Sequence, residues 1–314
     1  MIAHDYRSSD VSIDPATQIG AVALTVADLS RSLDFYTTGL GFSVLEQEGA
    51  GAVLGVADTP LVLLKEQRGV RPWPVYATGL YHFAILVPTR PDLGRWLRHF
   101  VELGNPLPGQ GDHLVSEALY LSDPDNNGIE VYRDRPRSEW HWAGGRVQMA
   151  TDPVDIRGLL AEADRTSEPW HGFAPGTRLG HVHLQVGNIA QAEAFYHGVL
   201  GFDVVAQFPG ALFVSAGGYH HHLGLNVWHS RGAAPAPVGS AGLRFYSIAL
   251  PTEEALGSVV ARLSEAGLMV SPADEVVAVR DPWQNLIHLH RGPLTDAASI
   301  ASLDYNLPGG ERIG

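Results

Sequence analysis

The chain contains 314 residues, with 21 Lys and Arg against 34 Asp and Glu, and it has no Cys. The length fits two ordinary domains, the 45% hydrophobic fraction is typical of a globular protein, and the net charge of -13 argues against nucleic acid as a partner. The lack of Cys excludes disulfides and thiolate metal ligands, and it agrees with a reducing cytoplasm, where we expect the protein to reside.

The chain begins MIAHDYRSSD, with no apolar stretch behind a basic end, so we expect no targeting signal. No apolar run approaches the roughly 20 residues that a transmembrane helix needs, so we expect no membrane partner. The sequence leaves open whether the protein is a homo-oligomer.

Most of the chain consists of one repeated unit. Residues 19–42, IGAVALTVADLSRSLDFYTTGLGF, return as residues 179–202, LGHVHLQVGNIAQAEAFYHGVLGF, at a constant offset of 160. Related units start at Gly79 (GLYHFAILVPT) and at Gly242 (GLRFYSIALPT). In each unit, short alternating or apolar runs predict strands, and apolar residues at helical spacing predict one helix after the first strand. We therefore predict an α+β protein made of four βαβββ units.

The unit boundaries divide the chain into four segments. A first pair of units occupies residues 17–133 and a second pair occupies residues 179–291. Residues 134–178 are the expected connector, with one predicted helix over Asp155–Ala163, and residues 292–314 are the expected C-terminal tail.

The first helix of each pair has clear start and stop signals. Asp28 and Asn188 are the predicted N-caps, and Gly39 and Gly198 are the predicted ends. We interpret the repeated FY and LGF residues of this segment as core packing of the helix on the sheet.

The repeated pattern IGxVxLxVxDLxxSLxFYxxxLGF resembles the vicinal-oxygen-chelate superfamily of glyoxalases, fosfomycin-resistance proteins and extradiol dioxygenases. Residues 111–130, GDHLVSEALYLSDPDNNGIE, resemble the extradiol dioxygenase signature, and the matching residues are His113, Leu119, Tyr120, Asp123, Pro124 and Glu130. Asn126 departs from that signature, which has Gly or Pro there, and we expect Gly128 to supply the turn. Residues 134–140 and 217–228 further resemble two-domain catechol 2,3-dioxygenases. The resemblance implies two pseudo-symmetric open barrels.

The resemblance also implies that metal ligands lie on the first and last strands of a unit. The four equivalent first-strand positions hold Ala21, His82, His181 and Phe245. The last strand of unit two carries Glu130, and the equivalent position of unit four carries His288. We predict that His82, His181 and Glu130 hold a metal. Two imidazoles and one carboxylate suit Fe(II), with Mn(II) as a substitute.

The position of these ligands predicts how the units pair. If unit one paired with two and unit three with four, His82 and His181 would line different cavities and each site would be incomplete. We therefore predict that unit two faces unit three, that unit one faces unit four, and that the second cavity has no metal.

Further histidines and a tyrosine are candidates for catalysis. The resemblance implies an acid–base histidine near the run His220–His222, which we expect on the last strand of unit three; His221 is favoured and His222 is the alternate. His113 and Tyr120 are expected to donate hydrogen bonds to the substrate. His183 is the alternate ligand, because it lies two residues from His181 on the same strand face.

The resemblance implies an extradiol dioxygenase that uses O2 to open the ring of a small aromatic, catechol-like diol. Two other functions stay open: a glyoxalase-like metal-dependent isomerase or lyase, and a non-catalytic protein that binds an aromatic compound. The substrate cannot be read from the sequence, but three aromatic residues are candidates for lining the pocket: Trp73, Trp140 and Phe208.

Overall fold

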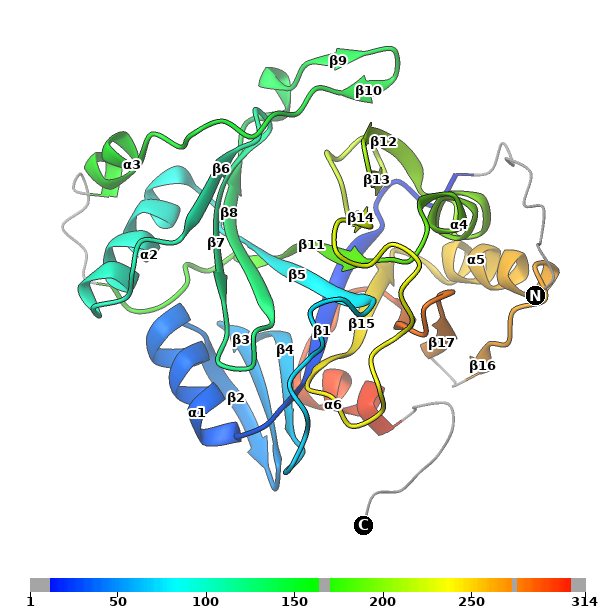
Figure 1. Ribbon diagram of the computed structural model, residues 1–314, viewed down its shortest axis with the longest axis horizontal. Coiled ribbons are helices and arrows are strands. Elements are labelled where there is room, and N and C mark those ends of the chain that lie inside the picture. Colours follow the sequence, from blue (N-terminus) through cyan, green and yellow to red (C-terminus); the bar gives the residue numbers. More distant parts are fainter. Residues whose placement is uncertain (1–11, 164–169, 273–275, 306–314) are drawn as a thin grey trace.

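In the part of the chain that the structure describes, the strands form two eight-stranded sheets and one small hairpin (Figure 1). The computed structural model describes residues 12–163, 170–272 and 276–305. Each unit folds as βαβββ: β1 to β4, β5 to β8, β11 to β14 and β15 to β18, with one helical segment after the first strand. The predicted α+β class with four βαβββ units is confirmed.

Each large sheet takes one unit from each half of the chain. The sheet that we call the 1/4 sheet has the order β16 (Ser271–Pro272), β17 (Val276–Arg280), β18 (Leu286–Arg291), β15 (Gly242–Leu250), β1 (Gln18–Val26), β4 (Thr59–Glu66), β3 (Gly51–Val56) and β2 (Ser43–Glu48). The 2/3 sheet has the order β12 (Asp203–Phe208), β13 (Ala211–Ser215), β14 (Leu223–Asn226), β11 (Arg178–Gln185), β5 (Gly79–Leu86), β8 (Gly128–Asp134), β7 (Ser116–Ser122) and β6 (Gly109–Asp112).

The two units of a sheet join through their first strands, which run antiparallel: β1 with β15, and β5 with β11. Within a unit the first strand pairs in parallel with the last strand, as β5 does with β8. The predicted pairing of unit two with three and of unit one with four is therefore confirmed. It follows that β5, β8 and β11 are neighbours, and these strands carry the three expected ligands.

The helices are α1 (Leu29–Asp34), α2 (Arg90–Glu102), α3 (Ile156–Ala163), α4 (Ile189–Glu193), α5 (Glu253–Glu265) and α6 (Ala297–Tyr305), with π-helical η1 (Phe35–Leu40) and η3 (Ala194–Val199) and the short 3-10 helix η2 (Arg137–Glu139). Strands β9 (Trp142–Ala143) and β10 (Arg146–Val147) form the hairpin of the connector. The main hydrophobic core combines residues of both large sheets and of the helices packed on them.

The predicted helix starts are confirmed, whereas the predicted ends are wrong. Asp28 accepts a hydrogen bond from the backbone N–H of Arg31, and Asn188 does the same for Gln191. The helix continues through Gly39 as a π turn and ends at Gly41, where φ is +100° and a Cβ would lie 2.6 Å from the Trp170 ring. The stop signal is therefore the glycine that needs the left-handed conformation.

The repeated tyrosines fill the core and also anchor turns. The buried Tyr36 hydroxyl donates to Asp123 Oδ2 over 2.9 Å, and Tyr196 donates in the same way to Asp281 over 2.8 Å. Asp123 holds the turn that leads into β8, because its Oδ1 accepts from the backbone N–H groups of Asp125 and Asn127. Asn126 occupies this turn with φ +65°, so Asn126 rather than Gly128 takes the left-handed position. Gly128 is needed because a Cβ there would lie 1.9 Å from the Tyr81 carbonyl oxygen.

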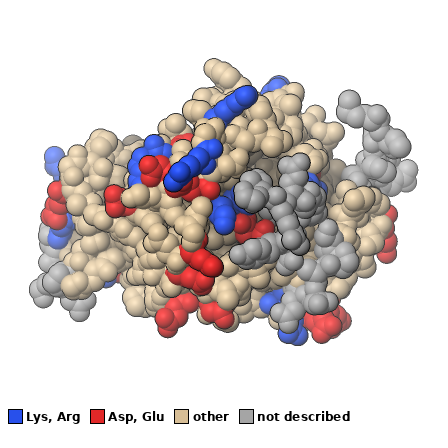
Figure 2. Space-filling model, turned by 90° about the horizontal axis from the view of Figure 1, so that it is seen from below, with Lys and Arg blue, Asp and Glu red and all other residues tan. Residues whose placement is uncertain are grey.

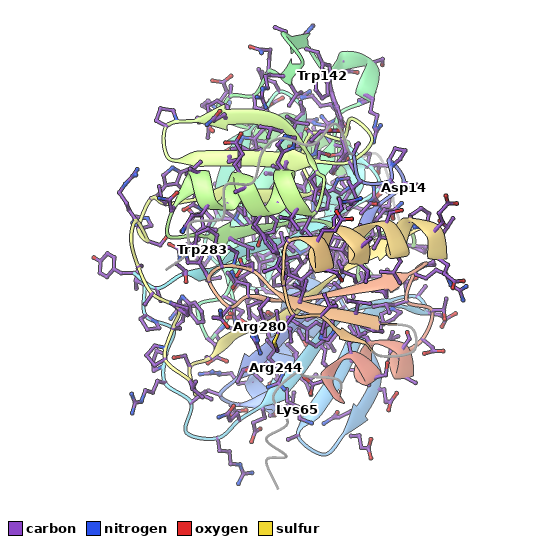
Figure 3. The ribbon with its side chains drawn as sticks, turned by 90° about the vertical axis from the view of Figure 1, so that its right-hand side faces the viewer. Asp14, Lys65, Trp142, Arg244, Arg280 and Trp283 are labelled. Atoms are coloured by element: carbon purple, nitrogen blue, oxygen red, sulfur yellow. The ribbon has the colours of Figure 1, made fainter. Side chains whose placement is uncertain are left out.

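The C-terminal helix α6 covers the face of the 1/4 sheet that is equivalent to the ligand-bearing face of the 2/3 sheet. Ile300 and Leu303 of α6 are fully buried in a cluster with Ala21 and Phe245. Figure 3 shows α6 beside the strands of unit one, with Arg244 and Lys65 at the same end of the molecule. Arg244 forms an ion pair of 2.7 Å with Asp304 of α6. Apolar packing therefore fills the space where the other sheet has its polar cluster.

The His288 ring packs against Phe245 of this apolar cluster, with a centroid separation of 4.7 Å. Both its ring nitrogens are buried without a hydrogen-bond partner among the described residues. Burial, followed by the charges of His290 and Arg280, lowers the pKa of His288 from 6.5 to about 4.

His288 is therefore protonated in the unfolded chain but neutral in the folded protein between about pH 6.5 and 4. Because the unfolded state binds the extra proton, the free energy of unfolding falls as the pH is lowered through this range. We expect His288→Leu to remove about 2 kcal/mol of the stability difference between pH 8 and pH 5. Urea unfolding of both proteins at the two pH values measures this, and equal pH dependence would contradict it.

Charged side chains of both signs are mixed on the surface face in Figure 2, among a larger uncharged area. Within the described residues, no helix has both the length and the apolar character needed to cross a bilayer.

Candidate metal centre and active site

Three potential ligand atoms from three neighbouring strands meet at one point of the 2/3 sheet. Glu130 Oε2 lies 3.0 Å from His82 Nε2 and 3.1 Å from His181 Nε2, and the two nitrogens are 3.3 Å apart. All three side chains are buried. The strand registers explain the convergence, because Ala84 pairs with His181 on one side and with Glu130 on the other. Among the described residues, His82, Glu130 and His181 form the group of side chains placed to hold a metal ion.

These separations fit one metal ion. Two ligand atoms about 2.1 Å from an ion and at right angles lie about 3.0 Å apart, so three such atoms can occupy one face of an octahedron. Burial alone would raise the pKa of Glu130, but the neighbouring His181 and His82 outweigh it and hold that pKa well below its usual range. Burial lowers the pKa of His82. An ionised carboxylate and a neutral imidazole are the forms that coordinate a metal.

His183 lies near the cluster but has a different partner. Its ring centroid is 4.9 Å from that of His82, and it lines the same cavity. His183 Nε2 accepts a hydrogen bond of 3.0 Å from the side-chain amide of Asn226. The structure therefore places His183 beside the three ligand-type residues and outside their group.

His113 and Tyr120 contact each other at the edge of the cluster. Tyr120 pairs with Glu130 across strands β7 and β8, and its ring lies 5.6 Å from that of His82. His113 Nδ1 is 2.7 Å from the carbonyl oxygen of Ala150, which can only accept, so His113 Nδ1 carries a proton. The Tyr120 hydroxyl lies 2.6 Å from His113 Nε2. Burial and then Glu130 raise the pKa of Tyr120 well above 10, so its hydroxyl stays neutral.

The run His220–His222 lies in the bend before β14, so its expected place on a strand is wrong. The bend, and not strand alternation, separates the three rings. The His221 ring centroid is 4.1 Å from that of His181, and His221 lines the cavity. His222 instead accepts a hydrogen bond of 3.1 Å from the backbone N–H of Ala216. His221 is thus the member of the run that faces the cluster.

A hydrogen-bond chain links His221 to the protein surface. His221 Nδ1 lies 2.8 Å from His220 Nδ1, and His220 Nε2 lies 2.8 Å from the carboxylate of Asp134, whose side chain is 23% exposed. A carboxylate can only accept, so His220 donates from Nε2, and its Nδ1 accepts from the Nδ1–H of His221. This arrangement leaves the lone pair of His221 on Nε2.

The cluster lies in a cavity of about 660 Å3. Its wall combines strands of the 2/3 sheet with Met149, Ala150 and Thr151 of the connector. Phe208 lines it, as expected, whereas Trp73 and Trp140 do not. Trp73 packs against Gly79 and Gly242, where a Cβ would lie 2.1 Å and 2.6 Å from its ring. Trp140 packs against His220, with a ring-centroid separation of 5.3 Å.

The family model described as Glyoxalase/Bleomycin resistance protein/Dioxygenase superfamily matches residues 18–131 and 178–289. The chain belongs to this superfamily. It is 45% identical over 286 residues to a protein from Bacillus subtilis named Catechol-2,3-dioxygenase, covering 86% of this chain and 96% of the relative. The resemblance to extradiol dioxygenases is thereby confirmed, and the chain is a dioxygenase-type enzyme.

Two solved structures share the architecture. A candidate dioxygenase from Bacillus subtilis aligns with a TM-score of 0.61 and 11% identity, over 94% of this chain and 97% of the other. Glyoxalase I from Zea mays aligns with a TM-score of 0.54 and 17% identity, over 94% of this chain and 98% of the other. At 11% and 17% identity, the likeness to these two structures shows a shared fold and nothing further.

Asp134 was not identified as functional from the sequence, and His220 was noted only as a member of the histidine run, without its role between Asp134 and His221. Asp134 has a signal that is readable in retrospect, because it lies four residues after Glu130 on the same strand and therefore on the same face. The signal for His220 was the histidine run itself, whereas its contact with His221 depends on the bend before β14.

Proposed function

We propose that this protein is an Fe(II)-dependent extradiol dioxygenase that opens the ring of a catechol-like diol with O2. His82, His181 and Glu130 are the proposed ligands. The observation that carries the proposal is the cluster of two Nε2 atoms and one carboxylate oxygen, 3.0 to 3.3 Å apart, in the cavity between units two and three. The 45% identity to a Catechol-2,3-dioxygenase supports it.

Bound Fe(II) would supply positions for the diol and O2 beside each other and the ability to pass an electron between them. With Glu130 ionised, the site would keep a charge of about +1, which favours a diol that has lost one proton. In the reaction the ring carbon–carbon bond next to the diol breaks, and each of the two separated carbons gains one oxygen atom of O2. No external reductant is needed.

The proposed role of His221 is to take the remaining hydroxyl proton of the diol and to return it as the ring opens. The lone pair on Nε2 of His221 can accept the hydroxyl proton of the diol. His113 and Tyr120 are proposed to hold the substrate oxygen, because they lie at the edge of the ligand cluster and Tyr120 has a neutral hydroxyl.

Asp134 and His220 are proposed to fix the tautomer of His221. We expect Asp134→Asn to lower kcat by roughly 10- to 100-fold, a part of what acid–base catalysis contributes, because an amide can donate to His220 and reverse the chain. Metal content should stay unchanged.

Tyr219→Phe is the matched control, since the Tyr219 hydroxyl also contacts Asp134, at 3.2 Å, without being part of the chain to His221. Steady-state kinetics of both variants with one diol are the measurement. An Asp134→Asn protein with the kcat of the unmodified enzyme, or an equal loss in both variants, would remove Asp134 from this role.

The two other functions considered for the sequence have less support. A glyoxalase-like isomerase usually has a second carboxylate ligand, whereas Glu130 is the one carboxylate among the described residues that line the cavity. A non-catalytic binding protein would not need a complete set of ligands.

The proposed function is tested by loading protein prepared without oxygen with Fe(II), Mn(II) or Zn(II) and measuring oxygen uptake with catechol. We expect uptake with Fe(II) and none with Zn(II), which cannot pass an electron. Equal activity with all three ions, or no uptake with any, would refute an oxygen-activating role.

A further inference from the structure

The cavity is larger than the diol ring requires. Its volume of about 660 Å3 lies in the range of pockets that hold drug-sized ligands, about 300 to 1,000 Å3. A catechol ring with its two oxygens has only eight non-hydrogen atoms. Once the diol contacts the ligand cluster, much of the cavity remains for a substituent.

Aromatic side chains extend from the ligand cluster to the mouth of this space. We call Tyr81, Phe208, Phe213 and Trp228 the aromatic wall; all four line the cavity. Tyr81 is in ring contact with His82 and with Trp228, at centroid separations of 5.4 and 5.5 Å.

Phe213 is in ring contact with Phe208, and the two outermost members of the wall are exposed. The Phe213 and Phe208 centroids are 5.8 Å apart. Trp228 is 48% exposed and Phe208 is 42% exposed. Exposed aromatic rings grouped at the mouth of a cavity are a surface that gains from apolar contact.

The charged residues of the cavity disfavour a substrate with a negatively charged substituent. No Lys or Arg occurs among the described residues that line it, and its one carboxylate is Glu130. A carboxylate on the substrate would have to leave water without a cationic partner, near an ionised Glu130 and in a protein with a net charge of -13.

We infer that the substrate is a diol with an uncharged, apolar substituent, alkyl or aryl, that lies along the aromatic wall. This inference rests on the proposed function. Apolar contact at the mouth of the cavity would select among diols. Rings that carry a carboxylate would be poor substrates.

The test compares kcat/KM for three probes with the Fe(II)-loaded enzyme: catechol, a phenyl-substituted catechol and 3,4-dihydroxyphenylacetate. We expect kcat/KM to be at least tenfold higher for the phenyl-substituted probe than for catechol, and at least tenfold lower for the carboxylated probe. Catechol turnover with equal or better use of the carboxylated probe would overturn the inference and leave the proposed function intact. No turnover of any probe would instead count against the proposed function.

Trp228→Ala separates the wall from the size of the cavity alone. It should lower the ratio of kcat/KM for the phenyl-substituted probe to that for catechol by at least fivefold. Trp142→Ala is the matched control, because Trp142 is also an exposed tryptophan, at 43%, but does not line the cavity. Trp142→Ala should keep the ratio. An unchanged ratio in Trp228→Ala, or the same fall in both variants, would overturn the role of the wall.

Discussion

Replacing His82 by alanine is expected to abolish stoichiometric metal binding, with the unmodified protein holding one ion per chain. His82 Nε2 lies 3.0 Å from Glu130 Oε2 and 3.3 Å from His181 Nε2, so its loss would leave two ligands in a buried pocket. Loss of a residue that only supports a ligand already weakens metal binding by roughly 10- to 100-fold, and loss of a ligand should cost more. Metal analysis after gel filtration of protein prepared without oxygen is the measurement.

His183→Ala is the matched control, because His183 neighbours the cluster in the same cavity and its Nε2 faces Asn226. That variant should keep one ion. A His82→Ala protein that still held iron or manganese at one per chain would show that the ligand assignment is wrong. Two ions per chain in the unmodified protein would contradict the prediction that the 1/4 sheet has no metal site. On that sheet Ala21 and Phe245 occupy the positions equivalent to His181 and His82, and they lie in an apolar cluster.

The second large effect is expected for His221→Phe, which should retain the metal and lose most of its turnover. General acid–base catalysis contributes roughly 10²- to 10⁴-fold. The His221 ring lies against that of His181, and the hydrogen bond of its Nδ1 to His220 leaves the lone pair on Nε2. Phenylalanine keeps the ring packing against Phe213, whose centroid is 5.0 Å away. Steady-state oxygen uptake, with iron content measured on the same sample, gives the result.

Anaerobic titration with the diol separates chemistry from binding in this variant. The diol should still bind to the Fe(II)-loaded protein, while oxygen consumption falls. Normal turnover of His221→Phe together with a loss in His222→Phe would transfer the acid–base role to His222. The structure makes that outcome unexpected, because His222 Nδ1 accepts from the backbone of Ala216.

The pairing of the units was predictable from the sequence because the repeat places equivalent residues at equivalent positions of each first strand. Equivalent positions of four units could be compared, and ligand-type residues occurred at the first-strand positions of units two and three alone. Convergence of His82 and His181 in one cavity then required a crossed pairing. The register of β5 with β11 has that arrangement.

Features outside the repeat could not be read in the same way. The run His220–His222 lies in a bend before β14, so the expected strand was the wrong local structure. The resemblance to extradiol dioxygenases, and not strand alternation, favoured His221, whose ring lies against that of His181. The role of α6 in filling the 1/4 sheet was also missed, because its residues belong to no repeat and were taken as a tail. Gly39 was mistaken for the helix end, since only the φ angle distinguishes it from Gly41.

The most direct test of the central claim is the fate of labelled oxygen during ring opening. Fe(II)-loaded protein is mixed with catechol under ¹⁸O₂, the product is trapped at once by chemical reduction of its aldehyde, and its mass is measured. The account predicts a ring opened next to the diol, with one labelled oxygen on each of the two separated carbons. A diacid opened between the two hydroxyls, or a product without label, would contradict it.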